Sequence, residues 1–242
     1  MRLTVLGCSG SYPGPECACS GYLVQGGGVN VLLDLGPGCL ANLQRHLAVT
    51  DIDAVVLSHS HPDHWVDLAG LETAWTHIFQ KQGLAVYGTP GTRDKATGLI
   101  GDLSPTIDWH DIADAQHLRI GGLDLGFSAT DHYVDTLAVR VAEGDRALAY
   151  SADTGPSWSF ADLGGHIDLG LCEATNLADG EGEGVLHLSA RQAGSMARRA
   201  GVDRLVLTHL LPGCDPEASR AEGTAAYGRP VEVAAIHARF DV

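Results

Sequence analysis

The 242-residue chain is poor in basic residues, with 15 lysines and arginines against 30 aspartates and glutamates and a formal net charge of −15. Proteins that grip long nucleic acids usually present a basic patch, because phosphate contacts dominate their affinity. Basic side chains gather only between Arg191 and Arg199, where a solvated helix face explains them. The charge balance therefore favours a small ligand over a long nucleic acid, without excluding the latter.

Long apolar runs and paired cysteine motifs are also missing. No stretch reaches the roughly 18–20 apolar residues of a membrane span, and no basic segment followed by an apolar one suggests a secretory signal. We therefore expect a cytoplasmic protein with no membrane contact. The six cysteines include no C-x-x-C pair, so we expect reduced and mostly buried thiols. A redox role for Cys17 and Cys19 stays open.

The pattern of apolar segments predicts one α/β domain over residues 1–242, a length that can bury a substantial core. The first half is rich in strands, and strands alternate with helices in the second half. Two mixed sheets flanked by helices, a four-layer αββα sandwich, account for this order. The expected strands are 3–6, 20–25, 29–34, 54–57, 85–88, 117–120, 123–129, 136–142, 147–150, 168–172, 204–207 and 231–235, and the expected helices are 39–47, 66–82, 89–100, 189–200 and 215–226.

A cluster of metal-ligating residues follows the apolar run 54–57. Three histidines and one aspartate lie within six residues, at positions His59, His61, Asp63 and His64. Ligands on the loop after a strand can converge on one point, and imidazole combined with carboxylate suits zinc, manganese or iron. His59 and His61 could face one ion, and Asp63 with His64 a second. Because this loop supplies too few ligands for two ions, the others must come from later in the chain.

Four later polar residues lie at the ends of apolar segments: His132, Asp153, His187 and His209. A histidine taken alone is more often a hydrogen-bonded structural residue than a ligand. These four share a location, the boundary between an apolar segment and the next element, which catalytic and metal-binding residues favour in layered α/β folds. We therefore expect them to join the histidine cluster in one site.

The order of these residues resembles the signature of the metallo-β-lactamase-fold hydrolases, and within them the ribonuclease Z-like branch. The motif His-x-His-x-Asp-His at 59–64 is followed by His132, Asp153 and His209. Further segments that resemble this branch are 3–13, 33–38, 173–175, 187–190 and 207–212. The resemblance covers nearly the whole chain, and it implies the αββα fold and a metal-dependent hydrolase with phosphodiesterase chemistry.

The resemblance also implies a role for each residue. Seven side chains would hold two divalent ions, with zinc as the first choice and manganese or iron as alternatives: His59, His61 and His132 on one ion, Asp63, His64 and His209 on the other, and Asp153 bridging both. Asp63 would also orient or deprotonate the attacking water, and His187 would protonate the leaving oxygen or bind the phosphate. Asp34 matches an acidic residue that braces the ligand loop. Thr175, Asn176 and Thr208 are candidate phosphate or base contacts, which their spacing does not test.

One departure from ribonuclease Z bears on the substrate. The tRNA-processing enzymes of this branch carry a long arm between the third motif histidine and the bridging aspartate. Here only 20 residues separate His132 from Asp153, and residues 136–150 predict a plain hairpin. Together with the acidic balance, this argues against tRNA cleavage. The remaining pattern resembles actinobacterial relatives that cleave 3′,5′-cyclic nucleotides, so we expect a small phosphodiester or nucleotide substrate, with 3′,5′-cyclic AMP leading.

Other functions stay open from the sequence. The same fold could carry tRNA 3′ processing, or the hydrolysis of a cyclic ribose phosphate, a lactone or a thioester. A non-catalytic metal-binding protein is a further alternative, although a degenerate site usually loses a ligand and all the ligand positions here are filled by competent residues. The residues do not determine the metal or the oligomeric state; relatives in this branch are often dimers, so a homodimer also stays open.

Overall fold

The computed structural model describes every residue from Met1 to Val242. Its strands are β1 (Arg2–Gly7), β2 (Gly21–Gly26), β3 (Val29–Leu35), β4 (Ala54–Val56), β5 (Leu84–Gly88), β6 (Ile107–Asp111), β7 (His117–Ile120), β8 (Leu123–Ala129), β9 (Leu137–Glu143), β10 (Arg146–Tyr150), β11 (Leu169–Glu173), β12 (Arg204–Thr208), β13 (Glu232–Val233) and β14 (Arg239–Asp241). Its α-helices are α1 (Cys39–Leu43), α2 (Asp67–Thr73), α3 (Pro90–Ile100), α4 (Ala190–Ala200) and α5 (Pro216–Tyr227).

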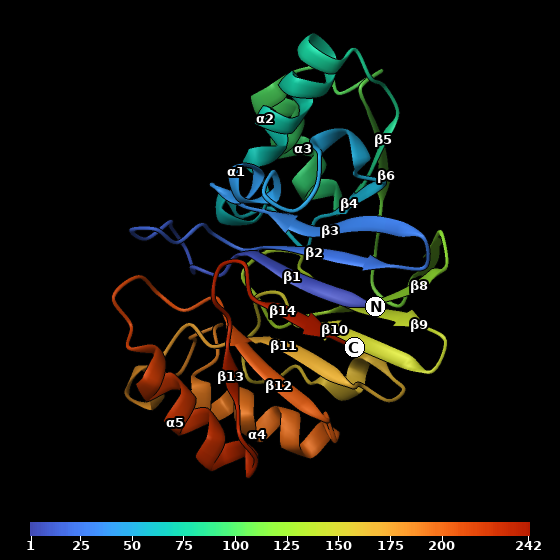
Figure 1. The fold of residues 1–242 in the computed structure, drawn as a ribbon. Helices are drawn as coiled ribbons and strands as arrows, with labels where there is room; N and C mark the ends of the chain where they lie inside the picture. The colour runs from blue at the N-terminus through green and yellow to red at the C-terminus, as the bar shows by residue number, and fades with distance from the viewer.

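The strands form two seven-stranded sheets that pack face to face. The first sheet has the order β14-β1-β2-β3-β4-β5-β6, and the second has the order β13-β12-β11-β10-β9-β8-β7. Helices α1, α2 and α3 cover the outer face of the first sheet, and α4 and α5 cover the outer face of the second (Figure 1). The predicted four-layer αββα sandwich is confirmed.

Apolar side chains on both faces of each sheet hold the layers together. In β3, Val31 and Leu33 point into the core between the sheets, whereas Leu32 points into the core beneath the helices of the first layer. A third core, which includes Met196 and Leu205, lies between the second sheet and its helices. Burial on both faces explains why these strands read as continuous apolar runs rather than as alternating ones.

Some predicted elements differ from the structure. The helix expected over 66–82 is α2 followed by a π-helical turn, Ala74–Phe79, which stops at Gln80 with a φ of 51°. The helix expected over 39–47 is the shorter α1. Strands β6 and β14 were not predicted, because both are short edge strands with partly exposed side chains and no apolar run.

The topology places the candidate residues at one edge of the sandwich. Strands β3, β4 and β5 run parallel, as do β10, β11 and β12, so the loops at their carboxyl ends leave at a shared edge. The last strand, β14, pairs antiparallel with β1 and brings the two chain termini together (Figure 1). None of the helices has the length and apolarity that crossing a bilayer requires.

Candidate metal centre

The predicted ligands form two groups of side chains at this edge. In each group the candidate ligand atoms lie within 4.8 Å of one another. The loop after β4, which includes a 3-10 turn over Pro62–His64, contributes the motif residues of 59–64 from the first sheet. The second sheet contributes the remaining three, which follow β8, β10 and β12: His132, Asp153 and His209. The structure therefore brings together all the residues that the sequence analysis named as ligands.

The first group consists of His59, His61, His132 and Asp153. His61 Nδ1 lies 3.1 Å from His59 Nε2 and 3.2 Å from His132 Nε2. Asp153 Oδ2 lies 3.7 Å from both Nε2 atoms. A tetrahedral zinc site with ligand distances of about 2.0–2.1 Å has edges of about 3.3–3.4 Å, so these separations match such a site.

The second group consists of Asp63, His64 and His209, with Asp153 beside it. His64 Nε2, His209 Nε2 and Asp63 Oδ2 lie 3.3 Å from one another. Asp153 Oδ1 lies 3.3 Å from His64 Nε2 and 3.4 Å from His209 Nε2. The two oxygens of Asp153 therefore face different groups, as a bridging carboxylate would.

Asp153 also tests whether this set of side chains fits metal ions. Its Oδ1 is buried and has no hydrogen-bond partner, and a buried carboxylate oxygen without a partner is costly. A cation held among the imidazole nitrogens and carboxylate oxygens would satisfy it. The nitrogen and oxygen donors, their spacing and this unpartnered oxygen together fit divalent ions.

Asp34 braces the ligand loop from the end of β3. Its Oδ1 accepts a hydrogen bond from the Ser58 backbone N–H (2.7 Å). Its Oδ2 lies within hydrogen-bond distance of Ser58 Oγ (2.8 Å), His64 Nδ1 (2.7 Å) and the Tyr150 hydroxyl (2.8 Å). The backbone of Asp34 is left-handed, with a φ of 57°, which is uncommon for a residue with a side chain. These contacts fix the ring of His64, because they engage its Nδ1 and leave Nε2 for a metal.

The Nδ1 atoms of two other candidate ligands also lie within hydrogen-bond distance of protein oxygens. His132 Nδ1 lies 3.0 Å from the Leu186 carbonyl oxygen, and His209 Nδ1 lies 2.9 Å from Thr175 Oγ1. Thr208 Oγ1 bonds the hydroxyl of Tyr22 at 2.7 Å. Thr175 and Thr208 are both buried and Asn176 is half-buried, and a contact of any of them with a substrate stays a prediction.

Burial shapes the charge of the candidate ligands. Burial is the main reason that the pKa values of His59, His61 and His132 lie below the usual value. These imidazoles are therefore neutral and able to bind a metal. Burial also lowers the pKa of His64, but the charges of Asp153 and Asp34 outweigh it and raise that pKa well above the usual value. A cation bound there would displace the His64 proton.

Asp63 is an ionised carboxylate in this centre. Burial raises its pKa, but hydrogen bonds from His209 and His64 outweigh burial and hold the pKa well below its usual range. The loop that carries Asp63 packs closely on β3, because a Cβ added at Gly36 would lie 2.0 Å from the Asp63 carbonyl oxygen. Only glycine permits this close approach.

His187 lies beside both groups, on the segment that leads into α4. Its Nδ1 lies 3.0 Å from Glu173 Oε1 and 3.3 Å from Thr175 Oγ1, and its ring stacks on that of His209 with the centroids 5.7 Å apart. Burial lowers the pKa of His187, but the hydrogen bond to Glu173 and the charge of that carboxylate outweigh it and raise the pKa to about 9. The imidazole therefore holds a proton at neutral pH and has Nε2 free to donate it.

Glu173 lies in the segment 173–175, whose pattern predicted no role for its side chain. Its side chain is fully buried and accepts hydrogen bonds from the backbone N–H groups of Thr154 (2.7 Å) and Leu188 (3.1 Å). The glutamate at the end of the apolar strand β11 was the signal in the sequence that could have indicated this role, because a buried carboxylate needs hydrogen-bond partners. Glu173 positions His187.

A cavity of about 450 Å³ opens beside His132. The start of α3 and residues 112–114, 129–130 and 132–137 line it, and the lining contains no lysine or arginine. Tyr133 is 58% exposed, and its hydroxyl donates to the Gly184 carbonyl and accepts from the Leu186 N–H, both at 3.2 Å. The ring of Tyr133 is thus held at its hydroxyl end beside the centre.

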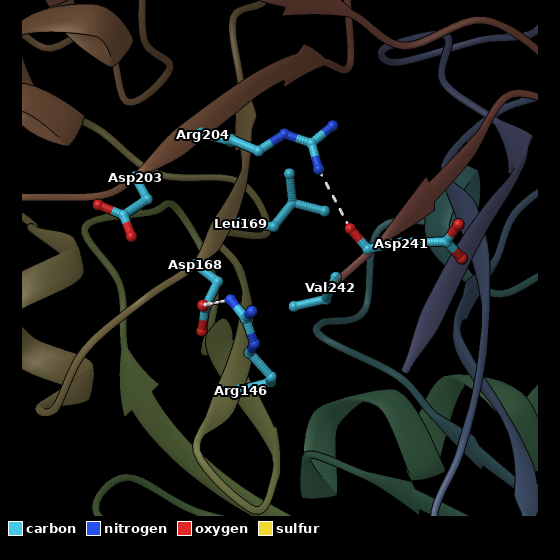
Figure 2. A pocket seen from close by; sticks show the side chains of 7 residues that line it. All are labelled: Arg146, Asp168, Leu169, Asp203, Arg204, Asp241 and Val242. Carbon is cyan, nitrogen blue, oxygen red and sulfur yellow. Dashed lines mark hydrogen bonds and ion pairs between the residues drawn. The ribbon is translucent and has the colours of Figure 1, made fainter.

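A second cavity lies far from the candidate metal centre. It is lined by residues before β11 and β12, at the amino ends of the parallel strands, whereas the candidate metal centre lies at their carboxyl ends. Arg146 donates to Asp168 at 2.6 Å, and Arg204 donates to the Asp241 carbonyl at 3.1 Å (Figure 2). Because these arginines are already paired within the fold, we do not assign a ligand to this cavity.

Comparison with known proteins defines the class. The profile of the β-lactamase superfamily domain matches residues 29–210. An uncharacterized protein of Mycobacterium tuberculosis is 35% identical over 254 aligned positions, which cover 100% of this chain and 92% of the relative. The probable metallo-hydrolase YhfI of Bacillus subtilis is 34% identical over 87% of each chain. The chain therefore belongs to the β-lactamase superfamily.

Solved structures agree with this assignment. The crystal structure of the Bacillus subtilis metallo-β-lactamase-fold protein YhfI has a TM-score of 0.90 at 28% identity, covering 99% of this chain and 98% of the other. The short form of human tRNase Z has a TM-score of 0.79 at 21% identity, covering 100% and 99%. Mycobacterial ribonuclease Z is 29% identical over 96% of this chain and 93% of the relative. The protein is a metal-dependent hydrolase of the metallo-β-lactamase fold, related to the ribonuclease Z-like branch.

Proposed function

We propose that the protein is a dinuclear phosphodiesterase that hydrolyses a small nucleotide, with 3′,5′-cyclic AMP as the leading substrate. The observation that carries this proposal is the arrangement of Asp153 between two ligand groups, directly beside a cavity that lacks basic side chains. Two adjacent cations suit one phosphodiester. A cavity without lysine or arginine suits an uncharged nucleoside better than a chain of further phosphates.

In this proposal the seven side chains would hold two ions, zinc first and manganese or iron as alternatives. His59, His61 and His132 would hold one ion, Asp63, His64 and His209 would hold the other, and Asp153 would contribute to both. When bound, such ions stabilise the charge on the phosphoryl oxygens and lower the pKa of water to about 7, so that hydroxide is available at neutral pH.

The remaining work belongs to the protein's own side chains. Asp63 faces His64 and His209 through Oδ2, which leaves Oδ1 to orient the attacking water and accept its proton. Attack on phosphorus in line with the 3′-oxygen breaks the ester bond on the opposite side. His187 donates its Nε2 proton to that leaving oxygen, and Glu173 keeps the ring charged and in place.

The cavity beside His132 would receive the nucleoside. Its volume of about 450 Å³ lies within the range of small-molecule sites. The exposed ring of Tyr133 offers a stacking surface for the base, and stacking on an aromatic ring contributes about 1–3 kcal/mol per base. Asp135, an exposed carboxylate of the same wall, can accept a hydrogen bond from an exocyclic amino group such as that of adenine.

Cleavage of tRNA is the alternative that the similarity to ribonuclease Z favours. Two features of this chain weigh against it. Strands β9 and β10 form a short hairpin with its turn at Asp145, in the place where an arm would have to emerge. The net charge of −15 also opposes the binding of a polyanion.

A substrate panel tests the proposal. The purified protein, loaded with zinc or manganese, would be compared with chelator-treated protein on cyclic AMP, bis-(p-nitrophenyl) phosphate and a precursor tRNA. We expect metal-dependent conversion of cyclic AMP to 5′-AMP and cleavage of the generic diester. If the protein cleaves the generic diester but not cyclic AMP, the phosphodiesterase chemistry is supported and cyclic AMP is refuted as the substrate. Processing of the precursor tRNA alone would establish the tRNA-processing function instead. If none of the three substrates is cleaved, the phosphodiesterase function is refuted.

A variant of the centre serves as the control. Asp63→Asn has the same shape and removes the charge that faces His64 and His209. We expect turnover to disappear while the circular dichroism spectrum stays native. Near-normal turnover from a well-folded variant would refute the role given to Asp63.

A further inference from the structure

Two cysteines on the segment between β1 and β2 bring their sulfur atoms together. Cys8 directly follows β1, and Cys17 lies further along the loop that leads to β2; their Sγ atoms are 3.8 Å apart. Sequence spacing pointed to Cys17 and Cys19, but the sulfur contact of Cys17 is with Cys8. Sulfur atoms at this separation need to approach by less than 2 Å to reach the disulfide length of about 2.05 Å.

The two thiols are also accessible to a small oxidant, and one of them is reactive. Both cysteines line a cavity of about 190 Å³, together with Cys214, and Cys17 is partly exposed. The hydrogen bond with Cys8 is the main cause that lowers the pKa of Cys17 to about 6, against the opposing effect of burial. Since the thiolate is the reactive form of cysteine, Cys17 is the nucleophile of the pair and Cys8, which keeps its proton, is its partner.

The loop between the two cysteines packs against a candidate metal ligand. The Gly10 N–H donates to the Leu210 carbonyl at 2.9 Å, so the loop is tied to the residue after His209. A Cβ at Gly10 would lie 2.6 Å from the His209 carbonyl oxygen and 2.9 Å from its Nδ1, which shows how closely the two segments approach. Movement of this loop therefore reaches the His209 imidazole directly.

We propose that Cys8 and Cys17 form a peroxide-sensitive dithiol whose oxidation to a disulfide displaces the loop at Gly10 and weakens the metal site at His209. The Cys17 thiolate attacks one oxygen of hydrogen peroxide, the O–O bond breaks, and a sulfenic acid forms with release of one water after proton uptake. The sulfur of Cys8 then attacks the sulfenic sulfur, the S–O bond breaks, and the second water leaves with the Cys8 proton. Peroxide gains the two electrons that the thiols lose.

The test uses the zinc-loaded protein and hydrogen peroxide as the oxidant. We expect mass spectrometry of the digested protein to show a Cys8–Cys17 linked peptide. A colorimetric chelator should meanwhile report at least a tenfold faster release of zinc than from untreated protein. Dithiothreitol should reverse both changes. This readout does not depend on the substrate, so a failed phosphodiesterase assay leaves it intact.

Two variants separate this pair from general thiol damage. Cys17→Ser should keep its zinc under peroxide, and because Cys17 is only partly buried the variant should fold. Cys214→Ser is the matched control: Cys214 lines the same cavity, but its sulfur contacts Ser219 at 3.7 Å rather than another thiol. It should respond as the native protein does. Absence of the linked peptide, a linked peptide without faster zinc release, or equal release from Cys17→Ser would each overturn the proposal.

Discussion

The role of His187 as the proton donor can be tested through the leaving group. The variant His187→Ala removes the group that protonates the leaving 3′-oxygen of a cyclic nucleotide, which is a poor leaving group as an alkoxide. In contrast, p-nitrophenolate is a stable anion that leaves without being protonated. General acid catalysis contributes about 10²–10⁴-fold. We therefore expect the turnover of cyclic AMP to fall by about that factor, and the turnover of bis-(p-nitrophenyl) phosphate to fall by less than about tenfold.

The pH dependence gives the same prediction a second readout. With a pKa of about 9, the His187 imidazole is protonated at neutral pH and loses its proton as the pH rises through that value. Cyclic AMP turnover should therefore decline on the alkaline side, at pH 9 or below, because neighbouring cations lower the pKa of an imidazolium. His187→Ala should abolish this alkaline limb.

The assay is a stopped-time measurement of 5′-AMP and of p-nitrophenolate over a range of pH, on native and variant protein with equal zinc content. An equal loss on both substrates, with the alkaline limb unchanged, would show that His187 supports the site without donating a proton. That result would refute the reasoning from Glu173 and the raised pKa.

Three further outcomes follow from the contacts described above. Asp34→Asn should weaken zinc binding by about 10–100-fold, measured by competition with a chelator, because the brace on His64 is lost; unchanged affinity would show that the brace is dispensable. Tyr133→Ala should raise the KM for cyclic AMP by about 5–150-fold, equivalent to about 1–3 kcal/mol of stacking, and leave the KM for the generic diester nearly unchanged; a parallel rise for both would place Tyr133 outside base recognition. Gly36→Ala should lower the melting temperature or the zinc content, because its Cβ collides with the Asp63 carbonyl; a native melting temperature with full zinc would contradict the tight packing.

The sequence allowed the layered fold and the clustering of the candidate ligand residues to be predicted because both leave local signals. Strands buried on both faces appear as apolar runs, and the candidate ligands lie at their ends, as His132 and His209 do. The edge strand β6 could not be found in this way, since its side chains are half exposed and its partner β5 supplies the register.

The supporting contacts of the centre were less accessible to sequence analysis. Tyr150 meets Asp34 across 116 positions of the chain, and Cys8 meets Cys17 across nine. Tyr150 lies in an apolar strand and has the composition of a core residue, so nothing local distinguishes it. The first pairing depends on how the two sheets pack and the second on how the loop after β1 folds back, and only the folded chain supplies both.

The candidate ligand set is divided between the two halves of the chain. The motif of residues 59–64 belongs to the first sheet, and the other three candidate ligands belong to the second, while β14 returns from the end of the chain to pair with β1. A cut in the exposed segment at 113–115, between β6 and β7, would leave each fragment with part of a metal centre. Neither fragment should act alone, and because β14 crosses from one to the other, the mixed fragments should reassemble and regain hydrolysis. The fold would then serve as a split reporter whose signal is the completed metal site.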